Sequence, residues 1–66
     1  MGSRHRLTGL LMQSKRGLIL EVEGGGVYAL DAERSADKMV GRRVTLEGVR
    51  VGFDRLDVEW IGLAET

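Results

Sequence analysis

The chain has 66 residues, a formal net charge of zero, and neither cysteine nor proline. A chain this short predicts a single domain over residues 1–66, with too little protein to enclose a large active-site cavity. The absence of cysteine excludes a disulfide framework and favours a reducing compartment, so we expect the cytoplasm. The balanced charge argues against a general attraction to nucleic acid or lipid. The apolar runs are far shorter than the ~20 residues that a membrane span needs, and the N-terminus has no signal-peptide pattern. We therefore expect no membrane association.

The N-terminal half alternates apolar and polar residues between glycine-rich turns, which is typical of β-strands. The pattern predicts three strands, over residues 6–12, 18–23 and 27–30. Glycines at 24–26 are expected to close a hairpin between the second and third strands. In the second strand Leu18, Leu20 and Val22 are expected to face the core, so Ile19, Glu21 and Glu23 face outward.

After Asp31 the apolar period changes from that of a strand to that of a helix. Apolar residues from Ala32 to Val40 fall on one helical face, which predicts a two-turn helix over 32–40. Asp31 is a suitable N-cap, and Gly41 can adopt the left-handed conformation just beyond the C-terminus. A helix therefore separates the third strand from the fourth.

Two further strands are predicted in the C-terminal half, over 42–51 and from 56 through 63, with Trp60 in the core. Gly9 and Gly48 lie inside predicted strands, where glycine marks a bulge or a sharp bend. The order β-β-β-α-β-β with bent first and fourth strands favours a five-stranded OB-type barrel. The alternative is an SH3-like small barrel.

A family resemblance covers most of the chain. The stretch from Gly41 to Val58, GRRVTLEGVRVGFDRLDV, is similar to the C-terminal half of a family of short, uncharacterised bacterial proteins. The segment GGGVYALD at 24–31 is also similar to that family's pattern. The resemblance implies a small β-barrel and supplies no activity, ligand or site residue.

No constellation of residues predicts an enzyme, a metal site or a bound cofactor. The glycines at 24–26 lead into a strand, whereas a phosphate-binding loop leads into a helix. Asp57 and Glu59 alternate with apolar residues as on a solvated strand face, and Asp54 suits a turn. Nucleophilic catalysis needs a nucleophile and a base, but cysteine is absent and the lone histidine, His5, lies in the N-terminal segment, so we expect no catalytic residue.

Two loops could bind single-stranded nucleic acid, because OB folds hold ligands between the loops joining strands one to two and four to five. These loops supply cations and one aromatic ring: Lys15, Arg16, Arg50, Phe53 and Arg55. A cationic groove with stacking aromatics is what single strands require. Against this, Glu21 and Glu23 on the strand face would repel phosphates.

Protein association is the other interpretation. Some apolar residues of the last two strands lie out of phase with the core positions, namely Val49, Val51, Ile61 and Leu63. An exposed apolar strand of this kind tends to pair with another chain unless a partner covers it. We therefore expect a small interaction module that forms a homo-oligomer or binds a protein partner, with nucleic-acid binding as the alternative.

Overall fold

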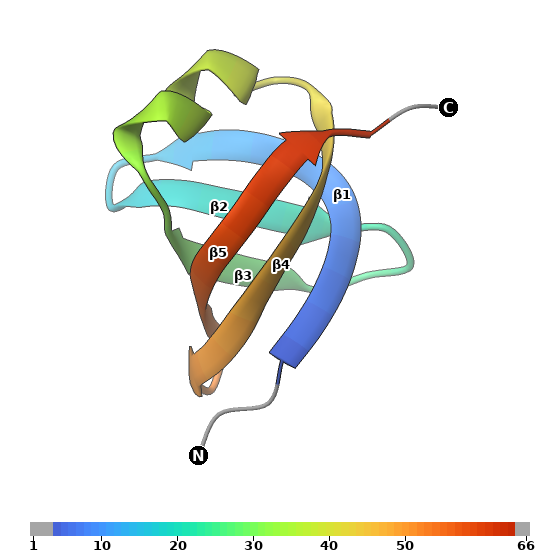
Figure 1. Cartoon of the computed structure of the whole chain (residues 1–66), viewed down its shortest axis with the longest axis vertical. Coiled ribbons are helices and arrows are strands. Elements are labelled where there is room, and N and C mark those ends of the chain that lie inside the picture. The colour runs from blue at the N-terminus through green and yellow to red at the C-terminus, as the bar shows by residue number, and fades with distance from the viewer. Residues whose placement is uncertain (1–3, 65–66) are drawn as a thin grey trace.

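The computed structural model describes residues 4–64, which form a closed five-stranded barrel (Figure 1). Its elements are β1 (Arg4–Ser14), β2 (Gly17–Val22), β3 (Val27–Asp31), the helical segment η1 (Arg34–Met39), β4 (Arg43–Gly52) and β5 (Arg55–Leu63). The predicted closed barrel of five strands, with one helical segment between the third and fourth strands, is confirmed, and it is compatible with an OB-like barrel. The same architecture is also compatible with an SH3-like small barrel. Within residues 4–64 there is no helix of the length and apolarity needed to cross a membrane.

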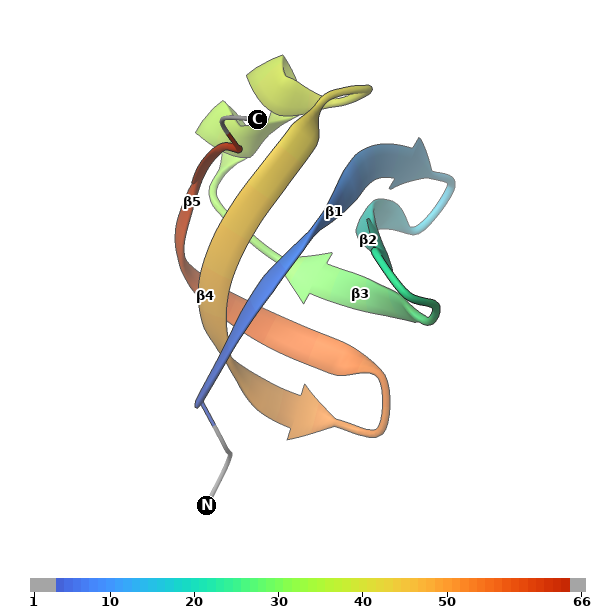
Figure 2. The ribbon, with the colours of Figure 1, turned by 90° about the vertical axis from the view of Figure 1, so that its right-hand side faces the viewer.

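Strand β1 belongs to both halves of the barrel. It pairs with β4 from Arg4 to Leu10 and with β2 from Gly9 to Ser14, both antiparallel. The strands follow the order β1-β2-β3-β5-β4, and the parallel pairing of β3 with β5 completes the closure. Figure 2 shows β1 crossing the molecule between the two halves. The bend predicted at Gly9 is therefore the place where β1 passes from one half to the other.

The bends require glycine because the backbones approach each other closely. A Cβ atom built on Gly9 would lie 2.2 Å from the carbonyl oxygen of Glu21, and one built on Gly48 would lie 2.6 Å from that of Asp57. Both distances are far below van der Waals contact. These two positions confirm the glycine bends predicted in the first and fourth strands.

The core is a single aliphatic cluster inside the barrel. Its members come from every strand and from η1: Leu11, Leu18, Leu20, Leu30, Ala36, Val44, Leu46 and Leu56. Removal of this much apolar surface from water is the main stabilising contribution in so small a domain. Tyr28 packs against the cluster, as its parity with Leu30 predicts.

The predicted helix over 32–40 is wrong in type and extent. Residues Arg34–Met39 form a 3-10 helix at one end of the barrel, seen at the top of Figure 1. Asp31 is not its N-cap, because it ends β3 and binds Arg55. The apolar face does pack as predicted, with Ala36 buried and Met39 against the core. Gly41 adopts the expected left-handed conformation, with φ of 85°.

Trp60 is not a core residue. The register of β4 and β5 shifts between Glu47 and Gly48, which pair with Trp60 and Val58, so that Glu59 is the extra residue of a bulge. A bulge reverses the inward and outward alternation beyond it. Trp60 therefore faces outward and is 51% exposed, whereas Ile61 faces inward and packs against the core.

Candidate interaction surface

The outer surface of β1, β2 and β3 is apolar in two adjacent rows. Cross-strand partners in an antiparallel sheet share a face. The register aligns Met12 with Ile19 and Ile19 with Ala29 in one row, and Leu10, Glu21 and Val27 in the next. We call this surface the apolar face and define it by its five apolar members: Leu10, Met12, Ile19, Val27 and Ala29.

The large side chains of the apolar face are open to solvent. Leu10 is 37% exposed, Met12 36% and Val27 50%, while Ile19 and Ala29 between them are half-buried. In OB folds, one of the two barrel types compatible with this architecture, ligands bind on the face of the second and third strands. A contiguous apolar patch at that place is a candidate contact surface.

Two ion pairs border the apolar face on opposite sides. Arg43 of β4 binds Glu23, which follows β2, through two nitrogen atoms. Arg55 of β5 binds Asp31 of β3, with 2.8 Å between Nε and Oδ2. These hydrogen bonds from the guanidinium groups hold the pKa of Glu23 and the pKa of Asp31 below their ordinary values. The charges at the border therefore neutralise each other.

Glu21 lies inside the apolar face rather than at its border. Its neighbours across the sheet are Leu10 of β1 and Val27 of β3. Its carboxylate is exposed and belongs to none of the ion pairs found in residues 4–64. The sequence prediction that Glu21 faces outward is confirmed, and the structure adds that its surroundings are apolar.

The β4–β5 turn lies beside the apolar face, because the Ala29 N–H donates to the carbonyl oxygen of Asp54 at 2.8 Å. Phe53 at its tip is 88% exposed. Arg50 stacks on the Phe53 ring at 5.7 Å from its centroid and donates to backbone carbonyls of the same turn. Both arginines predicted to bind phosphates from this turn, Arg50 and Arg55, are thus engaged within the protein.

The β1–β2 turn consists of Lys15 and Arg16, which are both exposed. The Ser14 hydroxyl donates to the Gly17 carbonyl at 2.8 Å and accepts from the Arg16 N–H at 3.2 Å, which fixes the turn. Neither Lys15 nor Arg16 takes part in an ion pair within the described part of the chain. Of the five residues predicted to bind nucleic acid, these two are the cations left without a carboxylate or carbonyl partner there.

The four residues predicted as an interface do not form one surface. Val49 and Val51 lie toward one end of the β4–β5 hairpin, while Leu63 pairs with Val44 at the other end. Val51 is 56% exposed and Leu63 48% exposed. Ile61 is half-buried and packs against the core, because the bulge at Glu59 turns it inward.

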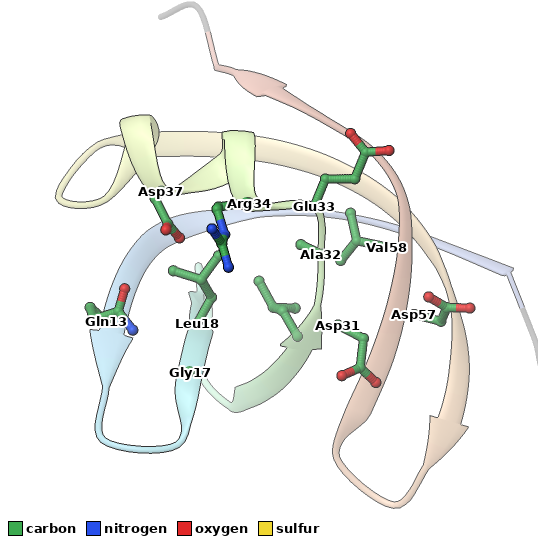
Figure 3. Close-up of a pocket in the computed structure, with 11 residues that line it drawn as sticks. Gln13, Gly17, Leu18, Asp31, Ala32, Glu33, Arg34, Asp37, Asp57 and Val58 are labelled. Atoms are coloured by element: carbon green, nitrogen blue, oxygen red, sulfur yellow. The ribbon is translucent and has the colours of Figure 1, made fainter.

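A groove opens beside η1, lined by the end of β1, the start of β2, the end of β3 and the first half of β5 (Figure 3). It has a volume of about 640 Å³ and apolar walls that include Leu18, Leu30 and Val58. Four carboxylates and one guanidinium line it: Asp31, Glu33, Asp37, Asp57 and Arg34. A lining of this charge disfavours phosphates and other anions.

Residues 4–64 contain no group of three or more histidine or carboxylate side chains placed to hold a metal ion. The Ser14 hydroxyl is used in the β1–β2 turn. The buried Nε2 atom of His5 has no hydrogen-bond partner in that part of the chain.

The sequence reasoning missed the apolar face. Leu10, Leu11 and Met12 are consecutive apolar residues of the first strand. Because successive side chains of a strand point to opposite faces, at least one of the three must face outward. Val27 likewise directly precedes Tyr28, which packs against the core. An apolar residue on the outward parity of three successive strands is the signal that could have located this surface.

The family described as Protein of unknown function (DUF5818) matches residues 8–64. No curated protein and no solved structure matches the chain. The matched region begins within β1 and ends at the residue after β5, so it contains β2, β3, η1, β4 and β5 entirely.

Proposed function

Since the chain belongs to the DUF5818 family, whose function is unknown, we propose from its surface that it is a non-catalytic protein-interaction module. The outer face of β1, β2 and β3 binds an apolar surface of a protein partner. The observation that carries this proposal is the exposure of Leu10, Met12 and Val27 in neighbouring rows of one face. The bacterial origin and cytoplasmic location indicated by the sequence belong to the same proposal.

The composition of the face supports a protein partner. Apolar contact surface buried at the centre of an interface, with charged groups at its rim, is the usual anatomy of protein–protein contacts. The apolar face has this layout, because the Glu23–Arg43 and Asp31–Arg55 pairs stand at its borders. Burial of its exposed side chains would supply the favourable free energy of association.

Single-stranded nucleic acid is the weaker alternative. Stacking of bases on the sheet needs aromatic rings, and the five apolar members of the face are all aliphatic. Phosphates need free cations, but Arg50 and Arg55 have partners within the chain. Glu21, which lies between Leu10 and Val27 on this face, would repel a phosphate backbone.

Site-specific photo-crosslinking tests the proposed function. A benzophenone side chain placed at Met12 on the apolar face, in cells that produce the protein natively, is expected to crosslink to protein. The matched control places it at Glu47, on the outer surface of β4, where Arg6 is its neighbour. Mass spectrometry identifies the crosslinked species.

The proposal is supported if Met12 yields a defined protein adduct and Glu47 does not. Adducts to RNA or DNA at Met12 would replace it with the nucleic-acid alternative. The absence of any adduct at Met12, or equal adducts at the two positions, would overturn it.

A further inference from the structure

An isolated carboxylate in an apolar surface restricts what can cover that surface. Glu21 lies between Leu10 and Val27 and has no ion-pair partner in residues 4–64. A partner that removes it from water without supplying a cation leaves a buried charge unpaired, which is strongly unfavourable. The complementary surface must therefore be apolar and must carry a cation at one defined position.

The chain itself carries such a cation next to the same face. The Lys15–Arg16 turn closes the β1–β2 hairpin, whose outward side chains include Leu10, Met12, Ile19 and Glu21. Glu21 thus lies toward one end of the hairpin's apolar strip and Lys15 and Arg16 at the other. The Ser14 hydroxyl fixes the turn, so the cations project from a defined place.

Resting on the proposed function, we infer that the partner of the apolar face is a second copy of this chain, related by a two-fold axis near the Met12–Ile19 pair. The axis places Glu21 of each copy against the Lys15–Arg16 turn of the other. Such an interface is isologous, so the charge pair forms twice. The apolar side chains of the two copies pack together between these two pairs.

The spacing along β2 permits this pairing. Glu21 is two residues from Ile19, about 7 Å along the strand, and Arg16 is three residues from Ile19 in the opposite direction, about 10 Å. A two-fold axis along the row of Met12 and Ile19 therefore brings Glu21 of one copy opposite Arg16 of the other, to within a few ångströms along the strand. The long, flexible side chains of Lys15 and Arg16 accommodate the difference.

Charge elsewhere on the surface does not oppose the contact. Glu23 and Asp31 at the borders already have arginine partners. The chain has a formal net charge of zero, so two copies experience no net repulsion. Self-association is also a common way to stabilise a domain of this size, which lacks disulfides.

Charge reversal in two separate variants tests the pairing. Glu21→Lys sets cations against the Lys15–Arg16 turn in its own homodimer, and Arg16→Glu sets a new carboxylate against Glu21. Each variant alone is expected to self-associate at least about tenfold more weakly than the wild type. In an equimolar mixture, however, the lysine introduced in one variant faces the carboxylate introduced in the other. The mixture is therefore expected to form heterodimers.

Sedimentation velocity with a fluorescent label on the Arg16→Glu variant measures the association. The wild type is expected to approach twice the 7.3 kDa of one chain as the concentration rises. Glu33→Lys is the matched control, because it has the same net charge as Glu21→Lys but changes the groove beside η1. It should dimerise like the wild type and recruit the labelled variant less than Glu21→Lys does. Circular dichroism verifies that each variant keeps the wild-type fold.

A wild type that stays monomeric at millimolar concentration would overturn the inference, as would a mixture that fails to associate. So would equal recruitment by Glu33→Lys and Glu21→Lys, since net charge alone would then explain it. If the inference fails in this way while Met12 crosslinks to a different protein, the proposed function stands with another partner. If Met12 crosslinks to no protein, the proposed function fails as well.

Discussion

On the outer surface of β4 and the first half of β1, polar side chains pair across the strands, whereas the outward side chains of the second half of β1, of β2 and of β3 form two adjacent apolar rows. Thr45 shares a hydrogen bond of 2.9 Å with Thr8, and Glu47 lies near Arg6. The Trp60 ring lies over Gly62, so a Cβ atom built there would be 3.0 Å from it. Val51, Trp60 and Leu63 of β4 and β5 are exposed as well, but the register of these two strands makes no two of them cross-strand partners.

This difference distinguishes a surface whose exposed apolar residues are scattered from one on which they are aligned. Exposed apolar residues are common on proteins when they are scattered. Their alignment in adjacent rows over three strands, bordered by neutralised ion pairs, is what makes the β1–β3 surface a candidate contact site. The β4–β5 surface therefore serves as an internal control for experiments on the apolar face.

The largest expected effect is at the bend that joins the two halves. Gly9→Ala places a Cβ atom 2.2 Å from the Glu21 carbonyl, a backbone atom that cannot move aside. We expect a loss of about 3 kcal/mol or more, close to the whole stability of a domain of this size, so that the variant is largely unfolded at 25 °C. Urea titration followed by circular dichroism measures it.

Gly62→Ala is the matched control on the β4–β5 surface. Its Cβ atom meets the outer edge of the Trp60 ring, which is exposed and can shift. We expect a change within about 1 kcal/mol. Equal losses in the Gly9 and Gly62 variants would contradict the close backbone approach at Gly9.

Next in size is the effect of a charge on the apolar face. Met12→Lys is expected to weaken association with the partner at least about tenfold, which corresponds to about 1.4 kcal/mol. Because Met12 is 36% exposed, the stability of the free chain should change by no more than about 1 kcal/mol. Sedimentation velocity and thermal unfolding measure the two quantities. Thr45→Lys on β4 should leave association unchanged, and an equal effect of both substitutions would remove the distinction between the two surfaces.

Trp60→Ala tests whether the Trp60 side chain on the β4–β5 surface contributes to the stability of the chain or to its association with the partner. Half of the Trp60 surface is removed from water by Gly62 and its surroundings, so we expect a loss of about 1 kcal/mol in the free energy of unfolding. Association should stay at the wild-type level. A Trp60 variant that keeps its stability but loses association would instead make this surface the contact site.

The smallest expected effect concerns pH and the ion pairs at the border. Arg55 holds the pKa of Asp31 below its ordinary value of 3.8 in the folded chain. A carboxyl group with a depressed folded pKa contributes stability above its unfolded pKa, and this contribution disappears as the pH falls through the folded value. Thermal unfolding from neutral pH down to strongly acidic pH should therefore show a steeper acid loss for the wild type than for Asp31→Asn. High salt should reduce the difference, because the pair is exposed. If the wild type and Asp31→Asn lose stability in parallel as the pH falls at low salt, the Asp31–Arg55 pair does not contribute to stability in this way.

Local patterns in the sequence determined the number and order of the strands, the hairpin at 24–26 and the glycine bends. The reason is that strand alternation and glycine conformation depend on a few neighbouring residues. All three hairpin glycines adopt positive φ, between 91° and 116°. The charge of the second strand's outer face, set by Glu21 and Glu23, was predictable on the same basis.

Only the tertiary structure decided which apolar residues remain uncovered and which cations remain free. Leu10, Leu11 and Met12 are alike in type, so pairing with β2 and β4 decides which of them enters the barrel. The bulge at Glu59 reverses the parity of β5 and exposes Trp60, because one extra residue turns every later side chain to the other face. Arg55 meets Asp31 across strands far apart in the chain. Register and closure set these contacts, and they depend on residues that lie far from each other in sequence.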